Sequence, residues 1–264
     1  MACLADKVLI ITGSTQGIGE SVALLAADSG AAGVVICGRQ QEKGEHVEAA
    51  IQKKGCRAIY VPADLSRVED CRRVVQACDE QFGRVDCLIN SAADTNRGTL
   101  DDTSVELWDY LFAVNVRAPF LLTQECVRIM RRETTAGRIV NIASIAGYCG
   151  QPTMVGYSTT KGALATMTAN CANALKEERI RVNGIMLGWT DTPGEDGVMR
   201  KNGFAENWLE TAEKAMPFGQ LIKAHEVARL CIFLLSDESG IMTGSLIDYA
   251  QRASAFVPPI EINW

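Results

Sequence analysis

Apolar runs of strand length recur along the chain, and segments with helical periodicity separate them. The runs lack the polar alternation of a half-exposed strand and cover residues 8–11, 34–37, 58–61, 88–89 and 139–142. Strands that are buried on both faces have this pattern. Amphipathic segments at about 18–29, 41–53, 68–82 and 104–132 predict the intervening helices. The alternation predicts an α/β fold, a doubly wound, mostly parallel sheet of Rossmann type with helices on both faces.

No linker or internal repeat divides the pattern, so we expect a single nucleotide-binding and catalytic domain over residues 1–264. The pattern of strands and helices is least regular in the stretch 188–217, which is rich in glycine and proline and contains Trp189 and Trp208. A long connection inside a compact domain is usually functional or mobile. We therefore predict a substrate lid here, with both tryptophans as candidate substrate contacts.

Charge and composition argue against several classes of function. The chain has 26 Lys and Arg against 32 Asp and Glu, a net charge of −6, which argues against a nucleic-acid surface. Its apolar runs fall far short of the roughly 20 residues that span a membrane, and no apolar segment of an export signal is visible at the start. The 10 cysteines lack metal-binding spacing, so we expect no metal, reduced thiols and a cytoplasmic protein.

Three glycines occur within seven residues at the first predicted junction between strand and helix. Glycine lets the backbone approach a pyrophosphate closely, and a helix N-terminus offers free N–H groups. The spacing Gly-x-x-x-Gly-x-Gly differs from the general dinucleotide fingerprint, and a plain turn is the alternative. The position at the first β–α junction favours a nucleotide. The candidate cofactor-binding residues are Gly13, Ser14, Thr15, Gln16, Gly17, Ile18 and Gly19.

The end of the second predicted strand, Cys37-Gly38-Arg39, bears on the choice of cofactor. Arg39 follows Gly19 by 20 residues, the distance at which a carboxylate would bind the ribose diol of NAD. Gly38 provides no carboxylate, and Arg39 brings a guanidinium suited to phosphate oxygens. We therefore expect NADP, with NAD as the alternative. Arg39 as a surface residue that opens the next helix is the competing interpretation.

Asp64 and Leu65 follow the third predicted strand. The Asp64 carboxylate is placed to accept a hydrogen bond from the amino group of an adenine. Capping of the next helix by Asp64 or Ser66 explains the same residues equally well.

A serine, a tyrosine and a lysine form the candidate reactive group. Ser144 ends the fifth predicted strand, where open α/β sheets bind ligands. Tyr157 follows 13 residues later, and Lys161 lies four residues further on, on the same face of a helix. A nearby ammonium favours the phenolate, so we expect Lys161 to lower the pKa of Tyr157 and make it a general acid/base.

The ordered set of motifs resembles the short-chain dehydrogenase/reductase family over essentially the whole chain. The matches are Thr12-Gly13-x-x-x-Gly17-Ile18-Gly19, Asp64, Asn90-x-Ala92, Asn115, Ser144, Tyr157-x-x-x-Lys161, Asn183 and Gly188-x-x-x-Thr192. The resemblance also covers the end of the chain, where residues 226–244 look like the last helix and strand of the family. It adds Asn90, Ala92, Gly188, Thr190 and Thr192 to the expected cofactor contacts.

The resemblance implies an oxidoreductase that interconverts a carbonyl and a secondary alcohol. Tyr157 would exchange the proton, Ser144 would hold the substrate oxygen, and Lys161 would bind the nicotinamide ribose. Asn115, which interrupts a long helix, would position a water that relays protons. The family is mostly oligomeric, so a tetramer or dimer is implied, built through the helices that contain Asn115 and Tyr157.

Several departures from the family pattern affect the expected shape of the pocket and leave the substrate open. They are Ser91-Ala92-Ala93, Leu187-Gly188 and Asp248-Tyr249-Ala250. The acidic pair Glu195-Asp196 in the predicted lid would disfavour anionic ligands or would simply face water. Competing hypotheses are an NAD-dependent alcohol or polyol dehydrogenase, a nucleotide-sensing regulator without turnover, and cofactor-independent chemistry on the same fold.

Overall fold

A parallel sheet runs through the molecule and contains all the predicted strands. The structure is a computed structural model and describes residues 3–148 and 151–251. The seven-stranded sheet has the order β3-β2-β1-β4-β5-β6-β9, and every pair in it is parallel. The strands are β1 (Val8–Thr12), β2 (Gly33–Gly38), β3 (Arg57–Pro62), β4 (Cys87–Asn90), β5 (Arg138–Ile142), β6 (Arg181–Leu187) and β9 (Leu246–Tyr249). The predicted doubly wound fold is confirmed.

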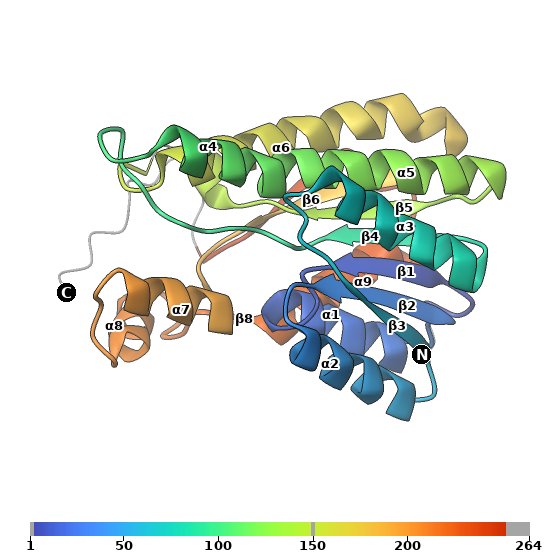
Figure 1. The fold of residues 1–264 in the computed structure, drawn as a ribbon, viewed down its shortest axis with the longest axis horizontal. Helices are drawn as coiled ribbons and strands as arrows, with labels where there is room; N and C mark the ends of the chain where they lie inside the picture. Colours follow the sequence, from blue (N-terminus) through green and yellow to red (C-terminus); the bar gives the residue numbers. More distant parts are fainter. Residues whose placement is uncertain (1–2, 149–150, 252–264) are drawn as a thin grey trace.

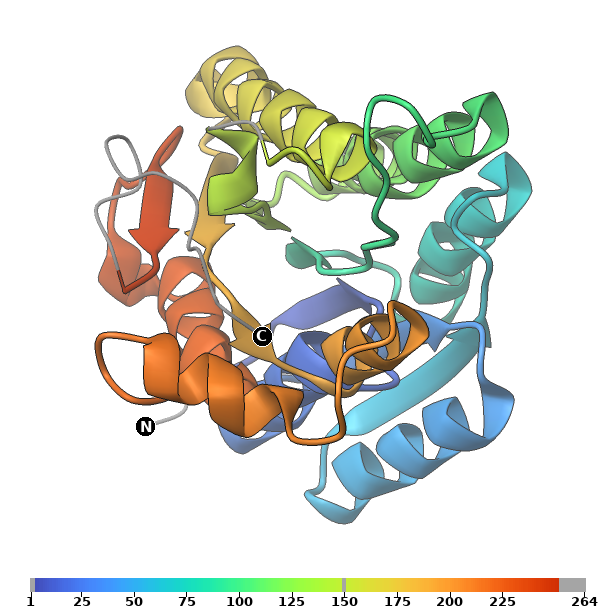
Figure 2. The ribbon, with the colours of Figure 1, turned by 90° about the vertical axis from the view of Figure 1, so that its left-hand side faces the viewer.

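Helices cover both faces of this sheet (Figure 1). One face carries α1 (Gly17–Asp28), α2 (Gln41–Lys53) and α9 (Ala224–Leu235). The other carries α3 (Val68–Phe82), α4 (Val105–Phe112), α5 (Ala118–Arg132) and α6 (Val155–Leu175). Figure 2 shows the three layers from the end at which the strands point toward the viewer. Within the described residues, no helix combines the length and apolarity needed to cross a bilayer.

The continuous apolar runs are explained by burial on both sides. In β1, Leu9 and Ile11 pack into the core under α1 and α9. Val8 and Ile10 point the other way, into the core under α3 and α5. Successive strand residues face opposite sides of a sheet, so a strand covered by helices on both faces needs apolar side chains at every position.

The predicted helix 104–132 is interrupted as expected near Asn115. A π-helical turn, Ala113–Arg117, separates α4 from α5. Ser104 caps α4 by accepting a hydrogen bond from the Leu107 N–H, and Pro119 lies in the first turn of α5, where it has no N–H to donate to the preceding π-helical turn. Single π-turns inside α-helices are frequent at functional sites.

The stretch 188–217 is more regular than its composition predicts. It forms β7 (Thr190–Asp191), α7 (Pro193–Lys201) and α8 (Trp208–Ala215), and β7 pairs with β8 (Ile222–Lys223). The residues that suggested irregular structure mark helix ends instead: Thr192 caps α7, Pro193 is in its first turn, and Gly203 follows it at φ +80°. Trp208, 1% exposed, supplies the core of this small lobe.

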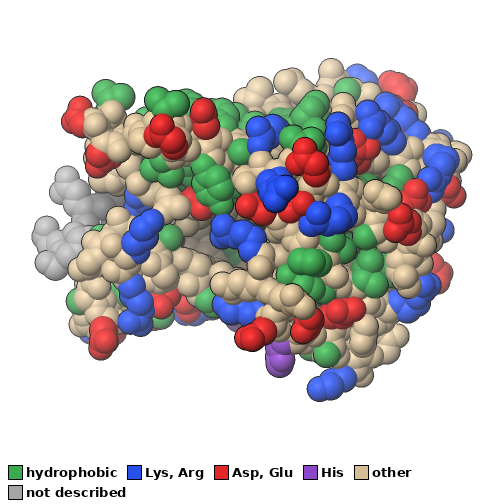
Figure 3. Space-filling view, in the orientation of Figure 1, with side chains coloured by type: hydrophobic (Ala, Val, Ile, Leu, Met, Phe, Trp, Pro, Cys, Tyr) green, Lys and Arg blue, Asp and Glu red, His purple; other side chains and the backbone are tan. Residues whose placement is uncertain are grey.

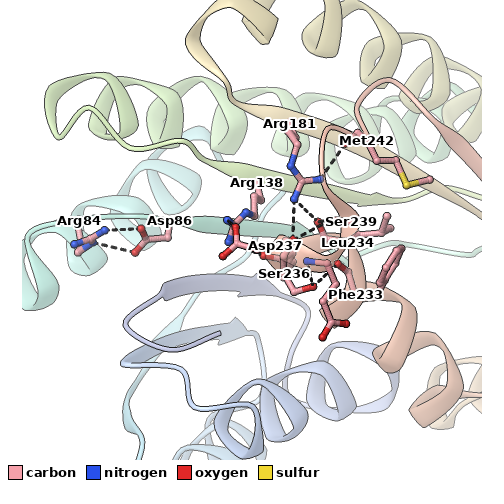
Figure 4. A network of polar contacts seen from close by, with 12 residues as sticks. Arg84, Asp86, Arg138, Arg181, Phe233, Leu234, Ser236, Asp237, Ser239 and Met242 are labelled. Carbon is pink, nitrogen blue, oxygen red and sulfur yellow. Dashed lines mark hydrogen bonds and ion pairs between the residues drawn. The ribbon is translucent and has the colours of Figure 1, made fainter. Parts of the chain in front are cut away.

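Two arginines fix the amino ends of the central strands to α9 (Figure 4). Arg181 donates to the carbonyls of Leu234, Ser236 and Met242. Arg138 donates to Leu235 O at 2.9 Å and pairs with Asp237. The last carbonyls of a helix have no partner within the helix, so these guanidinium groups complete the C-terminal end of α9 at the edge of the sheet away from the cavity described next.

Candidate functional site

A cavity of about 700 Å³ lies at the carboxyl ends of the strands. Residues that follow β1, β2, β3, β4, β5 and β6 all line it, together with the first turn of α7. The strand order reverses at β1, between β2 and β4, and open α/β sheets bind ligands at such a switch point. Figure 3 shows the surface hollowed between the α7–α8 lobe and the main body.

The glycine turn after β1 forms a wall without side chains. Gly13 and Gly17 have φ of +63° and +61°, a region that L side chains rarely adopt. A Cβ on Gly13 would lie 2.7 Å from Ala92 Cα, and one on Gly19 would lie 2.4 Å from Gly13 O. The backbone therefore stays open to a ligand at the start of α1, and this cradle fits a pyrophosphate. Thr15, Gln16 and Ile18 also line the cavity.

Ser14 does not line this wall. It is fully buried, its hydroxyl donates to Ile11 O at 2.6 Å, and it accepts from the Cys37 N–H at 3.0 Å. Its hydroxyl joins the ends of β1 and β2. The structure therefore places Ser14 as a support of the glycine turn, against the prediction of a direct cofactor contact.

Two cations lie at the far end of the glycine turn. Arg39 donates to the hydroxyl of Tyr110 at 2.9 Å, and both residues line the cavity. Lys43 donates to Gln16 Oε1 at 2.9 Å. Lys43 was not among the predicted site residues. The available signal was its place in the first turn of α2, the helix that begins two residues after Arg39.

Position 38 has no room for a side chain. A Cβ on Gly38 would lie 2.6 Å from Thr15 Cγ2. A side chain at position 38 would therefore require Thr15 to move, which favours glycine over an acid there.

Asp64 and Leu65 both line the cavity. Asp64 Oδ1 accepts a hydrogen bond from the Ser66 N–H at 3.0 Å. The N-cap of α3 is Arg67, which makes no side-chain cap. The alternative of helix capping by Asp64 or Ser66 is therefore wrong, because the chain makes one further turn before the helix begins.

At the end of β4, Ala92 lines the cavity, whereas Asn90 lies behind its wall. Asn90 is 2% exposed and donates to Asn141 Oδ1 at 2.8 Å. The hydroxyl of Thr12 accepts from the N–H groups of Ser91 and Ala92, each at 3.0 Å. The structure thus assigns Asn90 to the joint between β4 and β5 and does not bring it to the cavity.

The candidate reactive side chains converge. Ser144 follows β5, and α6 begins at Val155, so that Tyr157 and Lys161 lie in its first two turns. The Tyr157 hydroxyl shares a hydrogen bond with Ser144. Lys161 Nζ lies 5.6 Å from the centroid of the Tyr157 ring and donates to Ile142 O at 2.7 Å. All three side chains line the cavity.

The direction of the Tyr157 pKa contradicts the sequence expectation. Burial raises the pKa of the phenol to about 12, and the Ser144 hydrogen bond offsets only part of this effect. Burial also lowers the pKa of Lys161 to about 8. The buried charged form of each group loses its hydration, and this loss outweighs the expected effect of the ammonium on the phenol.

Asn115 also lies behind the cavity, 1% exposed. Its side-chain oxygen accepts from the Asp94 N–H at 2.8 Å, and its amide donates to Asp94 O at 2.9 Å. The same amide donates to Thr160 Oγ1 at 3.1 Å, and Thr160 donates to Tyr157 O at 2.7 Å. The side chain therefore joins the loop after β4 to the turn of α6 that carries Tyr157.

The remaining predicted residues lie on the lid side. Gly188, Trp189, Thr190 and Thr192 line the cavity. Trp208 does not: it is buried beneath Trp189, with ring centroids 6.0 Å apart. The prediction of a direct substrate contact from Trp208 is not supported, because its ring is buried in the apolar core of the lobe.

Comparisons with known proteins agree with this geometry. The family model described as Enoyl-(Acyl carrier protein) reductase matches residues 13–249. The 3-oxoacyl-[acyl-carrier-protein] reductase FabG of Thermotoga maritima is 33% identical, over 92% of this chain and 96% of that protein. The NADP-dependent (R)-specific alcohol dehydrogenase of Lentilactobacillus kefiri is also 33% identical, over 92% and 94%. A solved actinorhodin polyketide ketoreductase with NADPH has a TM-score of 0.89 and 26% identity, with 95% of this chain and 98% of that chain covered.

Proposed function

The chain belongs to the short-chain dehydrogenase/reductase family and is an oxidoreductase of alcohol or ketone substrates; from this premise we propose that it interconverts a carbonyl compound and a secondary alcohol with NADP(H). The observation that carries the proposal is the convergence of Ser144, Tyr157 and Lys161 in the cavity that the glycine turn lines. A nucleotide sensor without turnover would not need these three side chains together beside a glycine cradle.

In the proposed reaction, Tyr157 exchanges a proton with the substrate oxygen. With a pKa of about 12, the phenol is protonated at neutral pH and is ready to act as the acid in reduction. Ser144 donates or accepts a hydrogen bond at the same oxygen and fixes its position. Lys161 contributes an ammonium that binds ribose hydroxyls, and Asn115 holds the first turns of α6 in place. The bound nicotinamide cofactor supplies or accepts the hydride.

The preference for NADP over NAD is supported by the far end of the glycine turn. Thr15 excludes a side chain at position 38, so no carboxylate there repels a 2′-phosphate. Arg39 lines the cavity beside Tyr110, and Lys43 is hydrogen-bonded to Gln16, which also lines the cavity. Guanidinium and ammonium groups bind phosphate oxygens by charge-assisted hydrogen bonds. We also propose a homo-oligomer, assembled through the face of α4, α5 and α6, on which Phe120 is 47% exposed.

The test is turnover with each reduced cofactor against a panel of ketones. We expect a higher kcat/KM with NADPH than with NADH. Arg39→Ala and Lys43→Ala should each weaken NADPH binding about tenfold, the effect of one charge-assisted hydrogen bond, with NADH binding nearly unchanged. Lys53→Ala, at the other end of α2, is the matched control. A clear preference for NADH would contradict the cofactor assignment, and no turnover with either cofactor would contradict the proposed function.

A further inference from the structure

A partly buried ion pair crosses the substrate end of the cavity. Arg97 Nη2 lies 2.7 Å from Glu195 Oε1, and the two side chains are 18% and 13% exposed. Arg97 belongs to the loop between β4 and α4, and Glu195 belongs to the first turn of α7. Both residues line the cavity. The pair thus joins the main body to the lobe that covers the cavity.

The structure holds the Glu195 carboxylate in place from several sides. Trp189 Nε1 donates to the same oxygen, Oε1, at 2.9 Å. The Glu195 N–H donates to Thr192 Oγ1 at 3.2 Å, and the first turn of a helix favours a negative side chain. Among the described residues, the buried Nε of Arg97 has no hydrogen-bond partner. Removing two charges from water is costly, so a partly buried, pre-positioned pair at this place calls for a functional explanation.

The pair also lies near the reacting end of the cavity. Burial dominates the pKa of the Tyr157 hydroxyl, but Glu195 raises that pKa further and Arg97 lowers it. Apolar side chains, among them Met154, Phe204 and Met216, make up much of the remaining wall. A substrate with its carbonyl at Tyr157 therefore presents its neighbouring group to a wall that is polar but has no net charge.

We propose that the Arg97–Glu195 pair selects the substrate class: a neutral carbonyl compound, or its alcohol, with a second oxygen function such as a hydroxyl, ketone or ester carbonyl one or two carbons from the reacting carbon. This inference rests on the proposed function. The Arg97 guanidinium donates to the second oxygen, and the Glu195 carboxylate accepts from a hydroxyl. A substrate carboxylate is rejected, because Glu195 already neutralises Arg97 and repels a further negative charge.

The experiment compares ethyl acetoacetate with acetoacetate, which share the reacting ketone and differ in charge. In the unmodified holoenzyme, kcat/KM for the ester should exceed that for the anion. Glu195→Gln keeps the shape and removes the negative charge, so the ratio of ester to anion should fall at least about tenfold. Arg97→Gln should raise the ratio, because it leaves the carboxylate without its counter-charge. Glu206→Gln makes the same charge change on the exposed surface of the lobe and should leave the ratio unchanged.

Each outcome decides the proposal. A Glu195→Gln variant that loses activity on both substrates equally would assign the pair a structural role and overturn the inference. A preference of the unmodified enzyme for acetoacetate, or failure of the ester to bind or react while other ketones are reduced, would overturn it as well. Absence of cofactor oxidation with every carbonyl compound would instead overturn the proposed function.

Discussion

Tyr157 is the residue on which the proposed chemistry depends most directly. Tyr157→Phe removes only the hydroxyl from a half-buried ring, so the packing of α6 and the glycine cradle should persist. We expect turnover to fall about 10²–10⁴-fold, the usual contribution of general acid–base catalysis, with NADPH affinity nearly unchanged. Steady-state kinetics and cofactor fluorescence titration measure the two quantities. Near-full turnover in the variant would show that another group exchanges the proton.

Lys161 should have opposite effects on stability and on activity. Burial lowers its pKa to about 8 in the folded protein from the ordinary value of 10.5. Between these values the unfolded chain binds more protons than the folded one, so this residue makes stability rise with pH from about 8 to 10.5. At pH 7 the folded protein retains a poorly hydrated ammonium.

Lys161→Met should therefore reduce turnover strongly without lowering the Tm of the cofactor-free protein at pH 7. The variant should also lose the part of the pH dependence that Lys161 contributes. Thermal unfolding of both proteins at pH 7 and pH 10 tests this, because the difference in Tm between them isolates the lysine. A large loss of Tm in the variant at pH 7 would mean that the hydrogen bond to Ile142 outweighs the cost of burial.

At the scale of elements, α7 is the segment best placed to move. Its contacts with the loop after β4 are polar: the Arg97–Glu195 pair and a hydrogen bond from Lys201 to Asn96 Oδ1 at 2.9 Å. The apolar contacts of α7 lie within the lobe, where the buried side chain of Met199 packs in one cluster with the ring of Trp208 in α8. Polar contacts at a surface exchange readily with water, whereas apolar packing does not.

We therefore expect amide hydrogen exchange in α7 to slow when cofactor and substrate bind, with less change in α8. Lys201→Ala, which removes one contact outside the cavity, should speed exchange in α7 of the free protein. Lys214→Ala on the exposed face of α8 is the matched control. Equal protection of α7 with and without ligands would argue against a gating role.

At the scale of the whole molecule, the two edges of the sheet serve different purposes. The carboxyl edge holds the cavity, and the amino edge holds the arginine network that binds the end of α9 (Figure 4). Arg181→Met removes three hydrogen bonds from a charged donor, and each of the three carbonyl groups keeps one other donor, Ser239 or Asn183. We expect the free energy of unfolding to fall by about 2–4 kcal/mol, with kcat and KM unchanged at 25 °C. Urea unfolding and kinetics of the same preparation test this, and a changed KM would show that the two edges are coupled.

Much of the fold follows from local sequence pattern, because burial on both faces demands continuous apolar strands. The runs at 8–11 and 34–37 match β1 and β2 closely for this reason. The same reasoning did not predict the helices of 188–217. Pro193 and Gly203 look like helix breakers in the sequence, but in the structure they lie at the two ends of α7. Whether a proline starts or ends a helix depends on which residues its neighbours pack against.

The sequence by itself determined the parts of the site whose members are neighbours in the chain: the glycine turn, and Tyr157 with Lys161 one helical turn apart. Only the tertiary structure decided how these groups are charged and what surrounds them. The pKa of Tyr157 depends on burial, and Lys43 meets Gln16 across 27 residues, as Arg97 meets Glu195 across 98. Hydration and long-range pairing are properties of the packed chain, and no local periodicity encodes them.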